Sequence, residues 1–193
     1  MKSKYIESYE GLCHGTTSSY AQIIKKDGFL IKGDNSSWCG PGIYFYIDRS
    51  KAYWAAQRKC REINIKTKSN KETPVVINAD IINIEVTKIL DLRRRNDLES
   101  LNMMIRDFDS QCVQLENEGE TELTEDDKII ILRSMYISFY CAQNKKELVI
   151  GEFEQRNTNY NEHIHKFAEK FKIVYGNELI YCAKNSNIIS NIR

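Results

Sequence analysis

Short runs of hydrophobic residues, separated by polar stretches, predict a chain in which strands and helices alternate. Residues 43–47 are aromatic or β-branched, which is typical of a strand. An earlier, shorter strand is predicted to end at Leu12-Cys13, with a loop over 14–17 behind it. The other predicted strands lie at 75–92 (one bent strand or two), 148–150 and 179–182.

Helices are predicted where hydrophobic residues recur at intervals of three or four positions. Two early helices have residues that can cap their starts. Thr17 or Ser18 can cap the first helix, and Asp48 or Ser50 can cap the second. Gly28 suits the end of the first helix, where a positive φ is needed. The second helix is expected to continue to about Cys60.

The middle of the chain reads as helical. Apolar residues recur at helical spacing between Leu98 and Ile105, and residues 129–140 are apolar on most sides, which predicts a buried helix. A polar, acidic connection is expected over 116–127, and a short helix over 164–171. Together with the strands, this pattern predicts one α+β domain over 1–193, with a helical insertion at about 97–145.

Composition narrows the class of protein. Hydrophobic residues make up 41% and charged residues 28%, and the net charge is +1, so no global field draws the chain to nucleic acid or membranes. The first 71 residues are nevertheless basic and the remainder acidic, which fits either phosphate binding by the first part or a solvated surface whose charge is uneven by chance. The chain lacks a long apolar run and an apolar N-terminal stretch. We expect a cytoplasmic protein, or one exported without a signal into a host cytoplasm, and no membrane partner.

Six cysteines occur without a CxxC pair, so a zinc site is not expected, and several that lie beside apolar residues are expected to be free, buried thiols. The sequence also lacks the glycine-rich patterns of dinucleotide-binding Rossmann folds and P-loop enzymes, and the HExxH and GxSxG motifs.

Three separated segments carry candidate chemistry. They are Cys13-His14-Gly15-Thr16-Thr17, Gly40-Pro41-Gly42-Ile43-Tyr44-Phe45 and Asn177-Glu178-Leu179-Ile180-Tyr181. Taken singly, each has an ordinary reading as a structural histidine, a core tyrosine or a solvated glutamate. In this order they resemble the ADP-ribosyltransferase fold of diphtheria toxin and the poly(ADP-ribose) polymerases, which is built on a split β-sheet with flanking helices. The resemblance covers residues 11–60, 74–92 and 174–189.

The resemblance implies an NAD⁺ site. Glu178, His14 and Tyr44 would be the catalytic residues, with Glu178 holding a ribose hydroxyl near the oxocarbenium-like centre. His14 would bind the adenosine ribose, the Gly15 main chain would hold the nicotinamide carboxamide, and Tyr44 would stack on the nicotinamide ring. Thr16 and Gly42 are expected to support the same pocket.

The second wall of that pocket is ambiguous in the sequence. The family places a second aromatic residue eleven positions after the first tyrosine, and here that position is Ala55. Tyr53 shares a helical face with Ala56 and Cys60, which favours it as the inward ring, whereas a one-residue adjustment would bring in Trp54 instead.

Several other residues compete for a functional role. The acids Glu147, Glu152 and Glu154 flank a predicted strand, and we interpret them as exposed charges. His163 and His165 are interpreted as a solvated turn or helix start rather than a metal site, and Arg93-Arg94-Arg95 as a surface cluster. Gly176 stands where arginine-modifying relatives carry a second glutamate, which argues against that specificity.

The resemblance therefore predicts an NAD-dependent ADP-ribosyltransferase with NAD as co-substrate and no metal. Its acceptor would be a protein or a nucleic acid, and it would act as a toxin, an effector or a regulatory modifier, with an antitoxin or inhibitor protein as a further expected partner. Two alternatives stay open: an NAD glycohydrolase, and a catalytically weak NAD- or ADP-ribose-binding module. RNA 2′-phosphotransfer on a related fold fits the Gly-Ile-Tyr-Phe strand and Glu178 less well.

Overall fold

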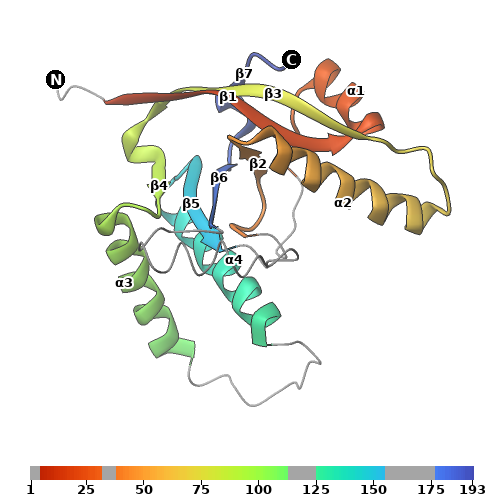
Figure 1. The fold of residues 1–193 in the computed structure, drawn as a ribbon. Coiled ribbons are helices and arrows are strands. Elements are labelled where there is room, and N and C mark those ends of the chain that lie inside the picture. Colours follow the sequence, from red (N-terminus) through yellow and green to blue (C-terminus); the bar gives the residue numbers. More distant parts are fainter. Residues whose placement is uncertain (1–4, 32–37, 113–124, 155–176) are drawn as a thin grey trace, which may run out of the picture.

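A computed structural model describes residues 5–31, 38–112, 125–154 and 177–193 (Figure 1). Within these ranges the elements follow one another as β1 (Ile6–Thr17), α1 (Ser18–Asp27), β2 (Ile43–Tyr46), α2 (Arg49–Thr67), β3 (Pro74–Glu85), β4 (Ile89–Asp91), α3 (Arg95–Cys112), α4 (Glu125–Gln143), β5 (Leu148–Glu154), β6 (Asn177–Ala183) and β7 (Ile189–Ser190). Single 3₁₀ turns precede β4 and β7. The predicted α+β class is confirmed, and the predicted helix over 164–171 lies outside the described residues.

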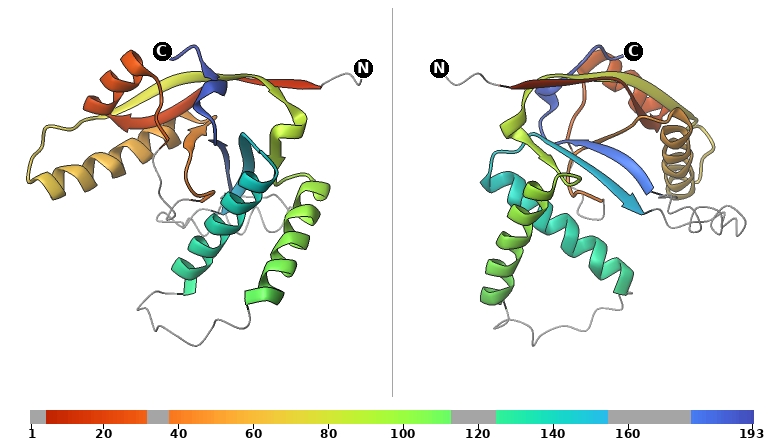
Figure 2. Two further views of the ribbon diagram at one scale, coloured as in Figure 1. Left: turned by 180° about the vertical axis from the view of Figure 1, so that it is seen from behind. Right: turned by 60° about the vertical axis from the view of Figure 1, so that its left-hand side comes forward.

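The strands form one mixed sheet in the order β4-β5-β6-β2-β1-β3-β7. All neighbouring strands are antiparallel except the parallel pair β4 and β5. The recorded pairing between β1 and β2 is limited to Cys13 opposite Tyr46, so the sheet is narrow at this joint. The β1–β3 pair runs across the direction of β5 and β6, as Figures 1 and 2 show.

The early elements extend beyond their predicted lengths. β1 continues to Thr17, and the loop predicted over 14–17 is wrong because these residues pair with Pro74–Ile77 of β3. The side chain of Asp48 accepts a hydrogen bond from the Ser50 amide, which confirms one of the two predicted caps, and α2 runs past Cys60 to Thr67. Thr17 occupies the cap position of α1 without a side-chain hydrogen bond to a main-chain amide of the helix; its hydroxyl lies 3.4 Å from Oγ of Ser19.

Two hydrophobic clusters lie on opposite faces of the sheet. The first includes Leu12, Phe45 and Tyr181 and is covered by α1. The second includes Val149, Ile180 and Cys182 and is covered by α3 and α4. Opposite residues of an antiparallel pair point to the same face, so Cys13, Tyr46 and Ile180 share the second face, and Gly15, two residues beyond Cys13, packs there against α2.

The predicted burial of residues 129–140 on most sides is wrong. α4 buries one side through Ser134, Ile137, Tyr140 and Cys141, whereas Ile129, Leu132, Met135 and Phe139 are exposed. The five cysteines whose side chains are described, Cys13, Cys39, Cys60, Cys141 and Cys182, are free and buried, as predicted. Among the described residues, no helix is long and apolar enough to cross a membrane.

Candidate functional site

The three candidate segments lie on three adjacent strands. The segment around His14 ends β1, the segment around Tyr44 forms β2, and Glu178 lies near the start of β6. Because the sheet order is β6-β2-β1, segments more than 160 residues apart in sequence are neighbours in space. The helix α2 packs on β1, β3 and β2 beside them (Figure 1).

His14 contacts β2 through its ring nitrogen. Its Nδ1 lies 2.8 Å from the main-chain oxygen of Tyr44, so Nδ1 carries the proton and Nε2 is left as an acceptor. The ring packs edge-on against Phe29 and beside Phe45, on the face that α1 covers. Burial lowers the pKa of His14, the hydrogen bond to the Tyr44 main chain raises it and the charge of Lys59 lowers it, which leaves it at about 4, so the ring is neutral at pH 7.

This placement separates the side chains of the first segment. His14 and Thr16 point to the first cluster, whereas Tyr44 and Glu178 point to the opposite face. Thr16 is fully buried, and within the described chain its hydroxyl has no hydrogen-bond partner. Sequence reasoning did not foresee this separation, because it took residues 14–17 for a loop.

Gly15 is required by helix packing. A Cβ at this position would lie 1.9 Å from the main-chain oxygen of Ala52, in the first turns of α2. The absence of a side chain therefore brings α2 directly onto β1. Gly42 has a similar role, because a Cβ there would lie 2.4 Å from Sγ of Cys182 on β6.

Tyr44 is anchored by its hydroxyl. The hydroxyl donates to the main-chain oxygen of Gly40 (2.5 Å) and accepts from the amide of Cys39 (3.0 Å). Burial raises the pKa of Tyr44 far above its usual value, and the neighbouring thiols Cys182 and Cys39 raise it further. The phenol thus stays protonated and holds the turn that precedes β2, while the half-buried ring packs on the second cluster.

Glu178 is a buried acid that lacks a full set of partners. Its side chain is 8% exposed, and within the described residues Oε1 has no hydrogen-bond partner. Burial raises the pKa of Glu178, the nearby ammonium of Lys51 lowers it, and the carboxylate of Asp48 raises it. An acid held in this way next to a cation can accept hydrogen bonds from a polar ligand.

Tyr46 is a site residue that the sequence reasoning missed. It lies opposite Ile180, two residues along β6 from Glu178 and on the same face. Burial raises the pKa of Tyr46 to about 12, and the charge of Glu178 raises it while Arg58 lowers it. The alternation of side chains along a strand could have identified Tyr46, because residues two positions apart, such as Tyr44 and Tyr46, point to the same face.

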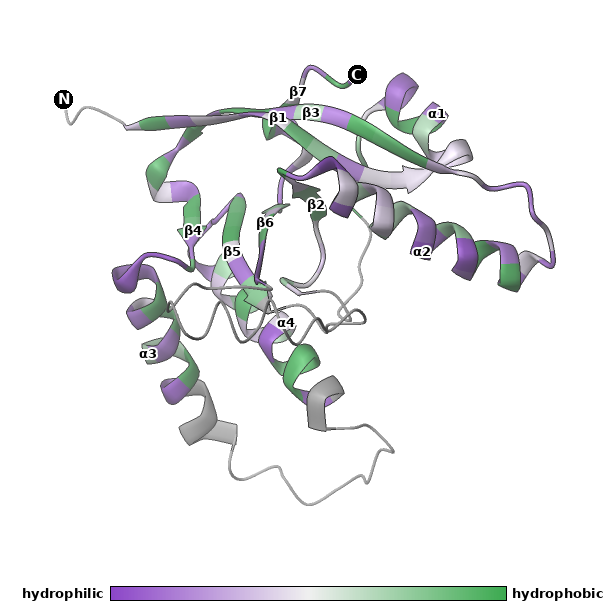
Figure 3. Ribbon diagram, viewed as in Figure 1, coloured by the Kyte–Doolittle hydropathy of each residue, from purple (hydrophilic) through white to green (hydrophobic). Residues whose placement is uncertain are grey.

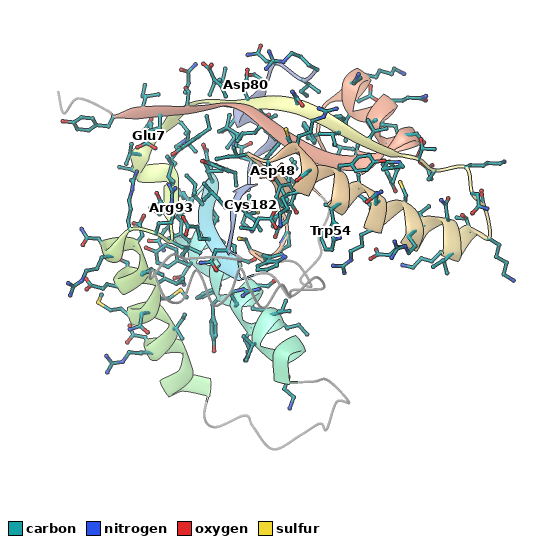
Figure 4. All side chains as sticks on the ribbon, viewed as in Figure 1. Glu7, Asp48, Trp54, Asp80, Arg93 and Cys182 are labelled. Atoms are coloured by element: carbon teal, nitrogen blue, oxygen red, sulfur yellow. The ribbon has the colours of Figure 1, made fainter. Side chains whose placement is uncertain are left out.

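The two candidates for the second aromatic wall lie on different sides of α2. The helix contacts the sheet through Ala52, Ala56 and Cys60, and Tyr53, expected as the inward ring, remains 44% exposed. Trp54 is 49% exposed and lies on the side of α2 away from β1 and β3 (Figure 4). It follows by three positions Lys51, whose charge lowers the pKa of Glu178, so the two side chains share this side of the helix. The structure therefore favours Trp54 over Tyr53 as the ring nearer to the acid.

The competing residues either have structural partners or are exposed. Glu147, expected to be exposed, is partly buried and forms an ion pair with Lys88, whereas Glu152 is exposed on β5 as expected. Arg93 and Arg94 bind Asp91, Arg94 also binds Glu7, and Arg95 pairs with Glu99, so this cluster is an ion-pair network. His163, His165 and Gly176, and the side chain of Glu154, lie outside the described residues. Within the described part of the chain, no group of His, Cys, Asp or Glu side chains could hold a metal ion.

Comparisons with models of protein families, with curated proteins and with solved structures find no match for this chain.

Proposed function

We propose that the chain is an NAD⁺-consuming ADP-ribosyltransferase whose reaction centre lies where β2, β6 and the first half of α2 meet. The observation that carries the proposal is the position of Glu178, a buried acid with an unpartnered oxygen on the same sheet face as Tyr44 and Tyr46. The adjacency of β1, β2 and β6 supports it, because the three segments that resemble the family converge there.

The chemistry accounts for an acid at this point. The bond between ribose and nicotinamide breaks, its electron pair leaves with nicotinamide, and positive charge develops on the ribose. Glu178 would accept a hydrogen bond from a ribose hydroxyl and hold negative charge beside that cation. A nucleophile of the acceptor then bonds to the ribose carbon and releases its proton. Preorganised charge of this kind typically contributes a rate factor of roughly 10²–10³.

The aromatic residues would bind the nicotinamide. Tyr44 offers the ring expected to stack on it, and its hydroxyl fixes the ring position through Gly40 and Cys39. Trp54 would close the opposite side. The His14 ring donates a hydrogen bond to the main-chain oxygen of Tyr44, so we propose that His14 positions β2. Its expected contact with the adenosine ribose stays a prediction.

Nicotinamide release from NAD⁺ by the purified protein tests the proposal, with and without a cell lysate as the source of acceptor. The variant Glu178→Gln removes the charge while keeping the shape of the side chain. Glu152→Gln is the matched control, since Glu152 is an exposed acid on the neighbouring strand, opposite Leu179. We expect lysate-dependent release that Glu178→Gln lowers at least a hundredfold and Glu152→Gln leaves unchanged.

Other outcomes separate the alternatives. Release that does not need lysate would indicate an NAD glycohydrolase. Binding of NAD⁺ without release would indicate a binding module, which the half-exposed rings of α2 and the alanine at position 55 would then explain. If NAD⁺ neither binds nor reacts, the proposed function is wrong.

A further inference from the structure

Of the described helices, α2 is the most basic. Its sequence contains six Lys or Arg residues and a single acid, Glu62, in a protein whose net charge is +1. The helix packs on β1 and β3 through small residues near its start, and its second half extends beyond β2 and β6 (Figure 1). In Figure 3 this half is mostly hydrophilic.

A stripe of cations and apolar side chains runs along the outer side of α2. Its members follow one another at intervals of three or four residues and are Lys51, Trp54, Arg58, Arg61, Ile65 and Lys68. This side is opposite the packed line through Ala52, Ala56 and Cys60. From Lys51 to Lys68 the stripe spans roughly 25 Å at the rise of an α-helix.

Both ends of the stripe have defined surroundings. At the first end, Lys51 lies close enough to Glu178 to affect its charge, and Arg58 does the same for Tyr46. At the other end, Arg61, Ile65 and Lys68 line a shallow hollow together with Asn64, Ser69 and Asn70. The stripe therefore leads from the proposed reaction centre to a polar, positively charged depression.

The cations of the outer half are available to a ligand. Arg61 and Lys68 are exposed, and within the described part of the chain neither forms an ion pair. Arg58 pairs with Glu62 on the helix surface, where both side chains are more than half exposed, so this pair is weak and easily replaced.

We propose that this stripe binds the acceptor of the reaction, and that the acceptor is a single-stranded nucleic acid. That the bound nucleic acid is an acceptor rests on the proposed function. Its binding to the stripe does not depend on that function. Cations spaced along a surface track phosphates, and flat or apolar side chains between them give bases a surface on which to stack. Trp54 lies one turn along the stripe from Lys51, whose charge lowers the pKa of Glu178.

The interleaving of side chains favours nucleic acid over an acidic protein. An acidic peptide needs cations alone, whereas Trp54 and Ile65 leave apolar surface exposed between them, at 49% and 70%. An exposed indole beside arginines matches unpaired bases, which can stack; in a duplex the bases are already stacked on one another.

Fluorescence anisotropy with labelled 15-nucleotide DNA and RNA oligomers, in the absence of NAD⁺, tests the surface. The variant Arg61→Gln/Lys68→Gln removes two charges from the stripe. Lys25→Gln/Lys26→Gln removes two exposed charges from the last turn of α1 and is the matched control. We expect wild type to bind an oligomer, the stripe variant to bind at least tenfold more weakly at 0.1 M salt, and the control to bind within twofold of wild type.

The dependence on salt gives a second readout. The slope of log K against log salt should be shallower for the stripe variant by about 1.4, since each phosphate contact contributes about 0.7 for a single strand. Equal losses in the stripe and control variants would overturn the proposal. So would tighter binding of a duplex, or equally tight binding of polyglutamate.

The two proposals can fail separately. Binding of an oligomer without any nicotinamide release would leave the surface established and the transferase proposal wrong. Lysate-dependent nicotinamide release without binding of any oligomer would leave the transferase established and the acceptor a protein.

Discussion

The imidazole Nδ1 of His14 lies 2.8 Å from the main-chain oxygen of Tyr44, and this bond joins β1 to β2 where the recorded pairing of the two strands is a single residue pair. The histidine thus donates a hydrogen bond that helps to hold β1 against β2. Burial keeps its ring neutral, because protonation would place a charge among Phe29 and Phe45.

We expect His14 to make the folded protein less stable as the pH is lowered. The folded pKa of His14 is lowered from 6.5 to about 4, so between these values the unfolded chain binds a proton that the folded chain does not. The stabilisation is therefore present above pH 6.5 and is lost as the pH falls toward 4, by about 3 kcal/mol at most. Urea unfolding of wild type and His14→Gln from pH 4.5 to 7.5 measures it. Parallel pH profiles for the two proteins would contradict this assignment.

The charge of Glu178 should respond in opposite directions to two neighbours. Lys51 lowers the pKa of Glu178 and Asp48 raises it, and the reaction requires the carboxylate. Lys51→Met should therefore move the acid limb of kcat/KM for nicotinamide release to higher pH, and Asp48→Asn should move it to lower pH. Asparagine can still cap α2, so the second variant keeps the helix start. Shifts of the same sign in both variants would exclude Glu178 as the group that titrates.

Much of this region could be predicted because its signals are local. Asp48 caps α2 through an amide two residues away, and Gly28 ends α1 with a φ of 82°. The extension of β1 to Thr17 could not be predicted in the same way, because its hydrogen-bond partners lie on β3, some 60 residues later. The exposed side of α4 could not be predicted either, because the sequence of a helix that is apolar on most sides does not show which side the sheet covers.

Gly15→Ala should be strongly destabilising. The new methyl group would meet the main-chain oxygen of Ala52 at 1.9 Å, and backbone cannot move aside as a flexible side chain does. We expect a loss of about 3 kcal/mol in the free energy of unfolding, as α2 moves away from β1. Gly28→Ala is a comparison for backbone strain alone: a Cβ there has open space, but the backbone at φ 82° and ψ −178° is one that essentially only glycine adopts, which should cost about 1–3 kcal/mol. A loss of less than about 1 kcal/mol for Gly15→Ala in urea unfolding would show that the close contact of α2 with β1 does not exist.

The same contact explains why the candidate site could be predicted only in part. The residues of the three segments were identified, and their strands are adjacent. Gly15, however, was interpreted through a ligand, whereas the neighbouring helix already requires a glycine. Tyr46 was missed and the side of Trp54 was left open, because both depend on how α2 lies over β2 and β6 rather than on the spacing of residues along the chain.

Tyr44→Phe separates anchoring from stacking. The substitution removes the hydroxyl that binds Gly40 and Cys39 but keeps the aromatic ring. We expect a loss of about 1–3 kcal/mol in stability, because a buried amide and carbonyl lose their partner. If the ring stacks on nicotinamide, the Kd for NAD⁺ measured by calorimetry should change less than threefold, while Tyr44→Ala should weaken binding further. Tyr44→Phe with unchanged stability would mean that the hydroxyl does not hold the turn.

Trp54 and Tyr53 form a matched pair of exposed rings on one helix, and replacing each by alanine decides which of them closes the pocket. Trp54 stands on the side of Lys51 and Arg58, near Glu178 and Tyr46, whereas Tyr53 lies at the edge of the contact with β1 and β3. A stacking ring contributes about 0.5–1.5 kcal/mol, so Trp54→Ala should raise the KM for NAD⁺ by roughly two- to tenfold. Tyr53→Ala should leave KM within twofold of wild type. Both rings are about half exposed, so neither variant should lose more than about 1 kcal/mol of stability, which urea unfolding can verify. The reverse order of the two effects would mean that NAD⁺ approaches α2 from the side of Tyr53, and that the nicotinamide lies away from Glu178.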